Sequence, residues 1–194
     1  MKTTKFLAFF FVAMLMLLLM TACDKNKNAT VISNEAQRIC GSWAYIHYKE
    51  TAIAVFRKDG TATYKGKKYT FECDSQFIKL KDKNDETIQL RYELDNEGMD
   101  LYSNNTYTFS GEGEPHGLVG EWLYPENKWS YEFTEGGTFL EDGLFPGYYT
   151  VDDESSTIKL VYNDQFEDTV CYFRLEEKTL HIEYPWPMVR MSDK

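Results

Sequence analysis

Groups of side chains that could bind a metal ion occur at two places in the chain. Residues 82–86 (DKNDE) are rich in the oxygens that bind Ca²⁺, but they lack the glycine and flanking helices of a calcium loop and are typical of a solvated hairpin. Glu112, Glu114 and His116 alternate in a glycine-rich segment that is typical of a flexible linker. We therefore expect no metal site.

The residues that most often carry catalysis are scattered. His47, His116 and His181 lie in different segments, and the sequence contains no nucleophile elbow, zinc-protease motif or phosphate-binding glycine loop. A pair of carboxylates suited to glycoside hydrolysis stays open, because its spacing is set in three dimensions. We expect a protein that is not an enzyme, with no catalytic residues and no cofactor.

The N-terminus carries a targeting segment. Two lysines precede an apolar run of 15 residues from Phe6 to Met20, and small residues follow it directly before Cys23. A positive start, a short apolar run and small residues at a cleavage site are typical of a secretory signal. An uncleaved signal anchor is the alternative, since the run falls only slightly short of the length that spans a bilayer.

The end of this segment, Met20-Thr21-Ala22-Cys23, resembles the lipobox of bacterial lipoproteins. In that family the cysteine is lipidated on its sulfur and becomes the new N-terminus after cleavage. The resemblance implies a signal peptide over residues 1–22, lipidation of Cys23, a tether over residues 23–36, and a place in the bacterial cell envelope, on the outer membrane. Whether the protein faces the periplasm or the cell surface stays open.

The remaining chain is acidic. Residues 1–22 contain two of the 21 basic residues and none of the 31 acidic ones, so residues 23–194 carry a net charge of about −12. This charge repels phosphate backbones and anionic headgroups. We expect no nucleic acid partner, and contact with the membrane through the lipid alone.

The sequence contains an internal repeat. Residues 41–43 (GSW) recur as 120–122 (GEW), and residues 56–61 (FRKDGT) recur as 133–138 (FTEGGT). Further matches follow in the same order, and the offsets of all the matches lie between 77 and 81 residues. The pattern indicates a tandem duplication, with repeat 1 over 37–110, a linker over 111–116 and repeat 2 over 117–194. We expect each repeat to form its own core.

Within each repeat the hydrophobic period is two, which is typical of β-strands. In residues 88–94, Ile88, Leu90 and Tyr92 face one way while the polar residues between them face the other. Strands are also expected at 43–48, 51–57, 61–65, 67–73, 77–81, 98–102 and 106–109. A short helical piece is expected near Asn34 to Arg38, with Ser33 or Asn34 as its cap.

The repeated order of a Gly-x-Trp strand, a glycine-threonine hairpin and paired IKL strands resembles the small lipocalin-like domains of bacterial lipoproteins. The resemblance implies an all-β fold of two tandem antiparallel β-barrels. It also implies that Trp43 and Trp122 close the two barrel floors, and that Arg190 packs across Trp122. The first repeat has Phe109 or Ser110 at the position of Arg190.

Three cysteines remain beside Cys23. Cys171 falls where repeat 1 has Leu90, on the inward face of a strand, so it is expected to be a small buried apolar residue. Cys40 and Cys73 are the candidate disulfide, since an exported protein meets oxidising conditions, although repeat 2 has no equivalent pair.

Aromatic residues concentrate in the second repeat, beyond what one small core needs. Trp186 stands between two prolines, and Trp129 has no apolar neighbour; with Tyr131 they are the candidate ligand-binding residues. We expect a non-catalytic binding protein that holds a small, partly apolar or saccharide ligand in a barrel mouth. The alternative is a module that contacts another envelope protein, with filled barrels and no small ligand.

Overall fold

The computed structural model describes residues 32–125, 129–163 and 166–192 of the chain, which has 194 residues. The signal peptide, Cys23 and the first part of the tether lie outside these residues. The described residues are all-β apart from one short helix, α2 (Asn34–Ile39). Their strands are β1 (Gly41–Tyr45), β2 (Ala54–Phe56), β3 (Thr61–Tyr64), β4 (Lys67–Cys73), β5 (Phe77–Lys81), β6 (Thr87–Leu94), β7 (Met99–Phe109), β8 (Gly120–Leu123), β9 (Ser130–Phe133), β10 (Thr138–Glu141), β11 (Phe145–Asp152), β12 (Thr157–Val161), β13 (Thr169–Glu176) and β14 (Thr179–Arg190).

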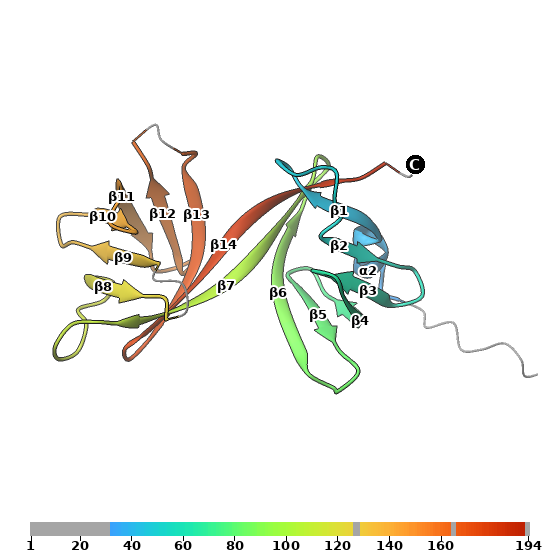
Figure 1. Ribbon diagram of the computed structural model, residues 1–194, viewed down its shortest axis with the longest axis horizontal. Helices are drawn as coiled ribbons and strands as arrows, with labels where there is room; N and C mark the ends of the chain where they lie inside the picture. The colour runs from blue at the N-terminus through green and yellow to red at the C-terminus, as the bar shows by residue number, and fades with distance from the viewer. Residues whose placement is uncertain (1–31, 126–128, 164–165, 193–194) are drawn as a thin grey trace, which may run out of the picture.

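The predicted all-β class is confirmed, and the strands form one antiparallel ring. Each strand pairs with the next along the chain, and β14 pairs with β1 to close the ring. The two longest strands, β7 and β14, also pair with each other from Thr179↔Thr108 to Met188↔Met99. In Figure 1 they run side by side as a ribbon that joins two groups of strands. The two strands expected at 98–102 and 106–109 are one continuous strand, β7.

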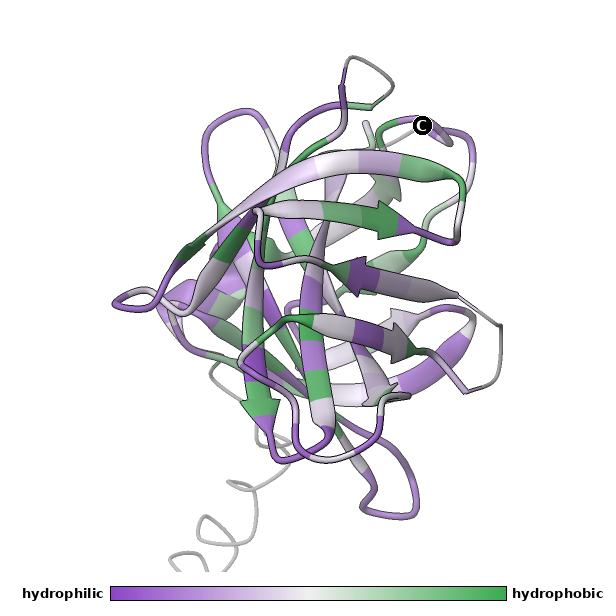
Figure 2. Cartoon of the chain, turned by 90° about the vertical axis from the view of Figure 1, so that its left-hand side faces the viewer, coloured by the Kyte–Doolittle hydropathy of each residue, from purple (hydrophilic) through white to green (hydrophobic). Residues whose placement is uncertain are grey.

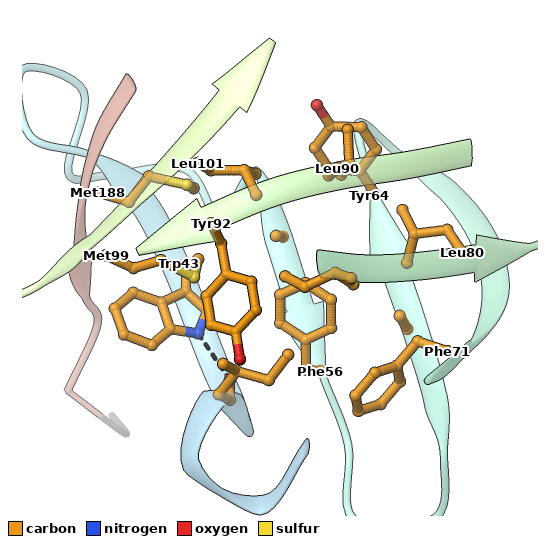
Figure 3. Packing of buried hydrophobic residues seen from close by; sticks show 14 of the residues in the cluster. Trp43, Phe56, Tyr64, Phe71, Leu80, Leu90, Tyr92, Met99, Leu101 and Met188 are labelled. Atoms are coloured by element: carbon orange, nitrogen blue, oxygen red, sulfur yellow. Dashed lines mark hydrogen bonds between the residues drawn. The ribbon is translucent and has the colours of Figure 1, made fainter. Parts of the chain in front are cut away.

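The described residues contain two separate clusters of buried side chains. The first core lies among β1–β6 and includes Met99, Leu101 and Met188 from the ribbon, as Figure 3 shows. The second core lies among β8–β13 and includes Tyr107 and Leu180 from the ribbon. Both cores are therefore completed by pieces of β7 and of β14.

The ends of β7 and β14 cross from one group of strands to the other. β7 begins beside β6 and ends beside β8, where Phe109 pairs with Trp122. β14 begins beside β13 and ends beside β1, where Arg190 pairs with Trp43 (Figure 1). The pairing of β7 and β14 therefore connects the two repeats expected from the sequence. A periodicity of two predicts a strand but carries no information about its partner.

The side-chain alternation that predicted the strands is visible in the hydropathy colouring of Figure 2. In β6, Leu90 and Tyr92 are buried and Leu94 packs against the first core, as predicted, while Ile88 near the strand start is 39% exposed. The helix is also confirmed. Ser33 caps it, because its hydroxyl accepts a hydrogen bond from the amide of Ala36 at 3.1 Å.

The same local hydrogen bond occurs in both repeats. The indole Nε1 of Trp43 donates to the carbonyl of Ile39 at 2.8 Å, and that of Trp122 donates to the carbonyl of Leu118 at 2.7 Å. In both cases the acceptor stands four residues earlier, and both tryptophans are buried. A buried indole needs such an acceptor, so the bond fixes the chain entry to β1 and to β8.

The candidate disulfide is not formed. Cys40 and Cys73 are free thiols, and the Cys40 thiol donates to the carbonyl of Ala36 at 3.2 Å. The Cys73 thiol lies beside the hydroxyl of Tyr92, and burial raises the pKa of this thiol. The two thiols therefore have different neighbours. Cys171 is fully buried in the second core, as predicted.

No helix among the described residues has the length and hydropathy required to cross a membrane.

Candidate binding site at the mouth of the second core

A layer of polar aromatic side chains closes one end of the second core, and we call this layer the mouth. Its position follows from strand alternation: Phe139 is buried in the second core, so Glu141, two residues further along β10, faces the same side. The mouth consists of Glu141 and the tyrosines that surround it, which are Tyr107, Tyr124, Tyr131, Tyr162 and Tyr184.

Glu141 is the centre of the mouth. The Tyr131 hydroxyl donates to its Oε1 at 2.8 Å, and the Tyr162 hydroxyl donates to its Oε2 at 2.7 Å. Burial raises the pKa of this carboxyl, although both hydroxyl bonds act in the opposite direction. Among the described residues, Glu141 forms no ion pair with a basic side chain.

The tyrosines of the mouth act as hydrogen-bond donors. Burial is the main reason why the pKa of Tyr131 and of Tyr162 lies well above its usual range, and the charge of Glu141 adds to this effect. Both phenols therefore remain protonated at physiological pH. The carboxylate is held in one orientation by two fixed donors, which is the arrangement of a preorganised binding group.

A row of aromatic rings connects Trp129 to Glu141. The ring centroids of Trp129 and Tyr124 are 6.0 Å apart, those of Tyr124 and Tyr107 5.7 Å, and those of Tyr107 and Tyr131 5.4 Å. Trp129 is 49% exposed, whereas Tyr131 is 3% exposed. Of these two candidate residues, Trp129 can touch a ligand directly, while Tyr131 acts through Glu141.

Trp186 lies on the ribbon beside the same mouth. Its ring centroid is 5.7 Å from that of Tyr184 and 5.5 Å from that of Tyr45, and its Nε1 donates to the Ser103 hydroxyl at 2.8 Å. The Tyr184 and Thr169 hydroxyls are 3.3 Å apart. Because Trp186 is 43% exposed, part of its ring is open to solvent.

A groove lies on strands of the second group, away from the mouth. It has a volume of about 320 Å³ and runs over β9, β10 and β11 between Glu132, Leu140, Tyr148 and Asn163. Tyr148 is 56% exposed and forms one wall. The groove is shallow and holds none of the three candidate ligand-binding residues.

The residues considered for metal binding lie in ordinary turns. Asp82 Oδ1 accepts from the amides of Asn84 and Glu86 at 2.7 and 3.0 Å, which is the geometry of a hairpin loop. His116 forms a backbone bridge with Val119 in the connection to β8. In the described part of the chain, no three His, Cys, Asp or Glu side chains come together in a metal-binding arrangement.

The expected contact between Arg190 and Trp122 is wrong. Arg190 lies over Trp43 instead, with its Cζ 4.4 Å from the ring centroid. Trp122 is covered by Phe109, whose ring centroid is 5.3 Å away. The reason is the crossing of β7 and β14, which brings the end of each repeat to the first strand of the other.

Comparisons of the chain with known protein families, with curated proteins and with solved structures find no match. The function is therefore argued from the geometry of the mouth.

Sequence reasoning missed Glu141 as a functional residue. The signal was present: Glu141 stands two positions after Phe139, at the inward position of a strand, and the matching position of repeat 1 is Tyr64. A carboxylate on the inward face of a strand is unusual, because burying a charge is costly unless it is paired.

Proposed function

We propose that the protein is an exported, lipid-anchored, non-catalytic binding protein of a bacterial cell envelope, which takes a small, partly apolar ligand at the mouth of the second core. The anchor is Cys23, on the outer membrane. The observation that carries the proposal is the mouth itself, where two tyrosine hydroxyls fix a carboxylate and the exposed indoles of Trp129 and Trp186 each contact a tyrosine of the same layer. Apolar ring faces with a few oriented polar groups are typical of small-molecule sites.

We also propose that each group of strands is a lipocalin-like barrel. Eight strands surround each core when the pairing of β7 with β14 is counted as the closing contact. An eight-stranded barrel has an interior that side chains can fill or that can hold one small ligand. The tryptophan at the first strand of each barrel, with its indole bonded to a carbonyl, supports this assignment.

The filled interiors favour a second function. Large rings such as those of Trp43, Trp122 and Tyr162 are fully buried, so a ligand would rest on the mouth rather than deep inside. Exposed apolar side chains on the outside, such as Tyr148 and Leu144, could instead serve contact with another envelope protein. In this alternative the groove beside Tyr148 is the contact surface.

Native mass spectrometry tests the two functions against each other. The Cys23→Ala chain, purified from its host, should carry a small non-peptide adduct that Trp129→Ala and Trp186→Ala each reduce. Tyr148→Ala is the matched control, since it removes an exposed ring from the outer groove and leaves the mouth unchanged. A protein partner that is lost only in Tyr148→Ala would favour the second function.

A further inference from the structure

We propose that the mouth binds the ammonium group of a small organic cation, with Glu141 as its counter-ion and the exposed rings of Trp129 and Trp186 beside it. This inference rests on the proposed function, because it names the chemical class of the ligand for the same site. It is carried by three observations on the described residues, which concern the repeat, the local charges and the rings.

The fold itself does not require a carboxylate at this place. Glu141 pairs across the strands with Tyr131, and the matching pair of the first core is Tyr64 with Ala54, in the same register. Tyr64 is 7% exposed and packs in the first core. The same architecture is thus built with an uncharged residue at the position of Glu141, so the carboxylate in the second core has a role beyond packing.

Among the described residues, no basic side chain forms an ion pair with Glu141. The titratable groups that face it from the neighbouring elements are acidic or neutral: Asp142 after β10, Tyr131 on β9, Tyr162 after β12, Cys171 on β13, Tyr184 on β14 and Tyr107 on β7. Two hydroxyl donors satisfy its oxygens but supply no positive charge. A half-buried carboxylate in such surroundings favours a bound cation.

Elsewhere the chain does neutralise a half-buried carboxylate. Glu183 on the ribbon accepts from Arg91 Nε at 2.5 Å, and the side chains are 26% and 20% exposed. The Arg91 guanidinium also lies 3.9 Å from the ring centroid of Tyr172. Here a carboxylate, a cation and an aromatic ring lie together in one cluster. The mouth has the carboxylate of Glu141 and the rings, and a ligand ammonium would supply the cation.

The rings of the mouth suit an organic cation rather than a metal ion. Trp129 and Trp186 expose indole faces, and Phe166, 52% exposed, packs 5.5 Å from the ring of Tyr162. Aromatic faces attract ammonium groups, most strongly when a neighbouring site is partly desolvated. A hard metal ion would need more oxygen ligands than the one carboxylate of the mouth supplies.

The experiment uses three probes of the same shape: benzylammonium, benzyl alcohol and benzoate. They are titrated at equal ionic strength into the Cys23→Ala chain, and the four tryptophan indole N–H signals are followed by NMR. Trp129 and Trp186 report on the mouth, while the buried Trp43 and Trp122 are internal controls. We expect saturable shifts of the mouth signals with benzylammonium, at an affinity at least about tenfold above that for benzyl alcohol.

Glu141→Gln removes the charge and keeps one of the two oxygens that accept the tyrosine hydroxyls. It should weaken the binding of benzylammonium by about tenfold and leave the binding of benzyl alcohol unchanged. Glu154→Gln, in the exposed turn after β11, is the matched control and should change neither affinity. The comparison of the three probes uses the chain without any change at Glu141. It therefore shows whether the mouth prefers a cation even if Glu141→Gln does not fold.

Equal affinity for benzyl alcohol and benzylammonium, or stronger binding of benzoate, would overturn the cation site and leave the proposed function standing. Unchanged benzylammonium affinity in Glu141→Gln would likewise overturn it. If none of the three probes shifts the signals of Trp129 or Trp186, both the cation site and ligand binding at the mouth are contradicted.

Discussion

Arg190 holds its guanidinium over the indole of Trp43, with Cζ 4.4 Å from the ring centroid, although the two residues belong to different repeats. The same guanidinium donates to the carbonyl of Arg38, at 2.7 Å, and to that of Cys40, at the end of α2. The last residues of β14 thereby close the first core, while its first residues pack in the second core. Phe109, at the end of β7, covers the indole of Trp122 in the same way. Each repeat therefore supplies the residue that covers the tryptophan of the other.

The first prediction concerns this contact. Arg190→Ala should lower the free energy of unfolding by about 2 kcal/mol, because it removes a cation–π contact and hydrogen bonds to two carbonyls. Urea unfolding of a double-mutant cycle with Trp43→Leu should show that most of this loss vanishes in that background. The matched cycle with Trp122→Leu should be additive, and coupling to Trp122 in place of Trp43 would contradict the crossing of β7 and β14.

The crossing also predicts which fragments fold. Residues 117–194 lack β7, which leaves the edges of β8 and β14 unpaired, so this fragment should aggregate or give poorly dispersed amide signals. Residues 99–186 contain all the strands around the second core and should give dispersed NMR signals and cooperative unfolding. The reverse result, with 117–194 folded and 99–186 collapsed, would mean that each repeat is self-contained.

How much of this could be read from the sequence depends on the range of the interaction. The strands, the cap of Ser33 and the burial of Trp43, Trp122 and Cys171 follow from local periodicity and from the repeat, and they agree with the structure. The crossing of β7 and β14 could not be predicted, because the first strands of the two repeats are equivalent partners for the end of each of these strands. A repeat shows which positions are alike but not which copy a strand joins.

The three candidate ligand-binding residues differ in exposure. Trp129 and Trp186 are exposed, whereas Tyr131 is buried, which the sequence pattern did not indicate. Tyr131 and Glu141 meet only because β9 and β10 pair in one particular register. The inward position of Glu141 can be read from the sequence, but its tyrosine partners cannot, because Tyr131 and Tyr162 come from other strands and loops.

Gly147 tests the packing below the mouth. A Cβ at this position would lie 2.3 Å from the carbonyl oxygen of Val161 and 2.5 Å from the ring of Phe139. Gly147→Ala should therefore cost about 1–3 kcal/mol of unfolding free energy, measured by urea denaturation. Gly136→Ala is the control, since its Cβ would meet nothing closer than 3.7 Å. Equal stability of the two variants would show that β11 does not pack against Phe139 in this way.

The stability of the protein should depend on pH through Glu141. Burial raises its folded-state pKa above the ordinary value of 4.5, so between these two values the folded state keeps a proton that the unfolded state has lost. The free energy of unfolding contributed by this group therefore falls as pH rises through that window. The other groups facing it are Asp142, Cys171 and the tyrosines Tyr107, Tyr131, Tyr162 and Tyr184.

Unfolding of the wild-type chain and of Glu141→Gln at pH values from about 4 to about 7 measures this effect, because only the wild type can titrate at the site. The variant should gain stability relative to the wild type as pH rises, while Glu154→Gln should show no such trend. A difference that stays constant over this range would mean that burial does not raise the pKa of Glu141.

The anchor is tested by Cys23→Ala. Because the cysteine of the lipobox is the predicted attachment point of the lipid, the variant should move from the membrane fraction to the soluble envelope fraction. Immunoblots of fractionated cells after a salt wash provide the measurement. Retention of the variant in the washed membranes would favour the uncleaved apolar segment as the anchor.

Ligand binding at the mouth is tested most directly by NMR on the Cys23→Ala chain purified together with the molecule it carries. Intermolecular nuclear Overhauser effects should connect this molecule to the indole protons of Trp129 and Trp186, which contact Tyr124 and Tyr184 of the mouth, and not to those of the buried Trp43 and Trp122. Contacts confined to Tyr148 and the outer groove, with none to either mouth indole, would contradict the account.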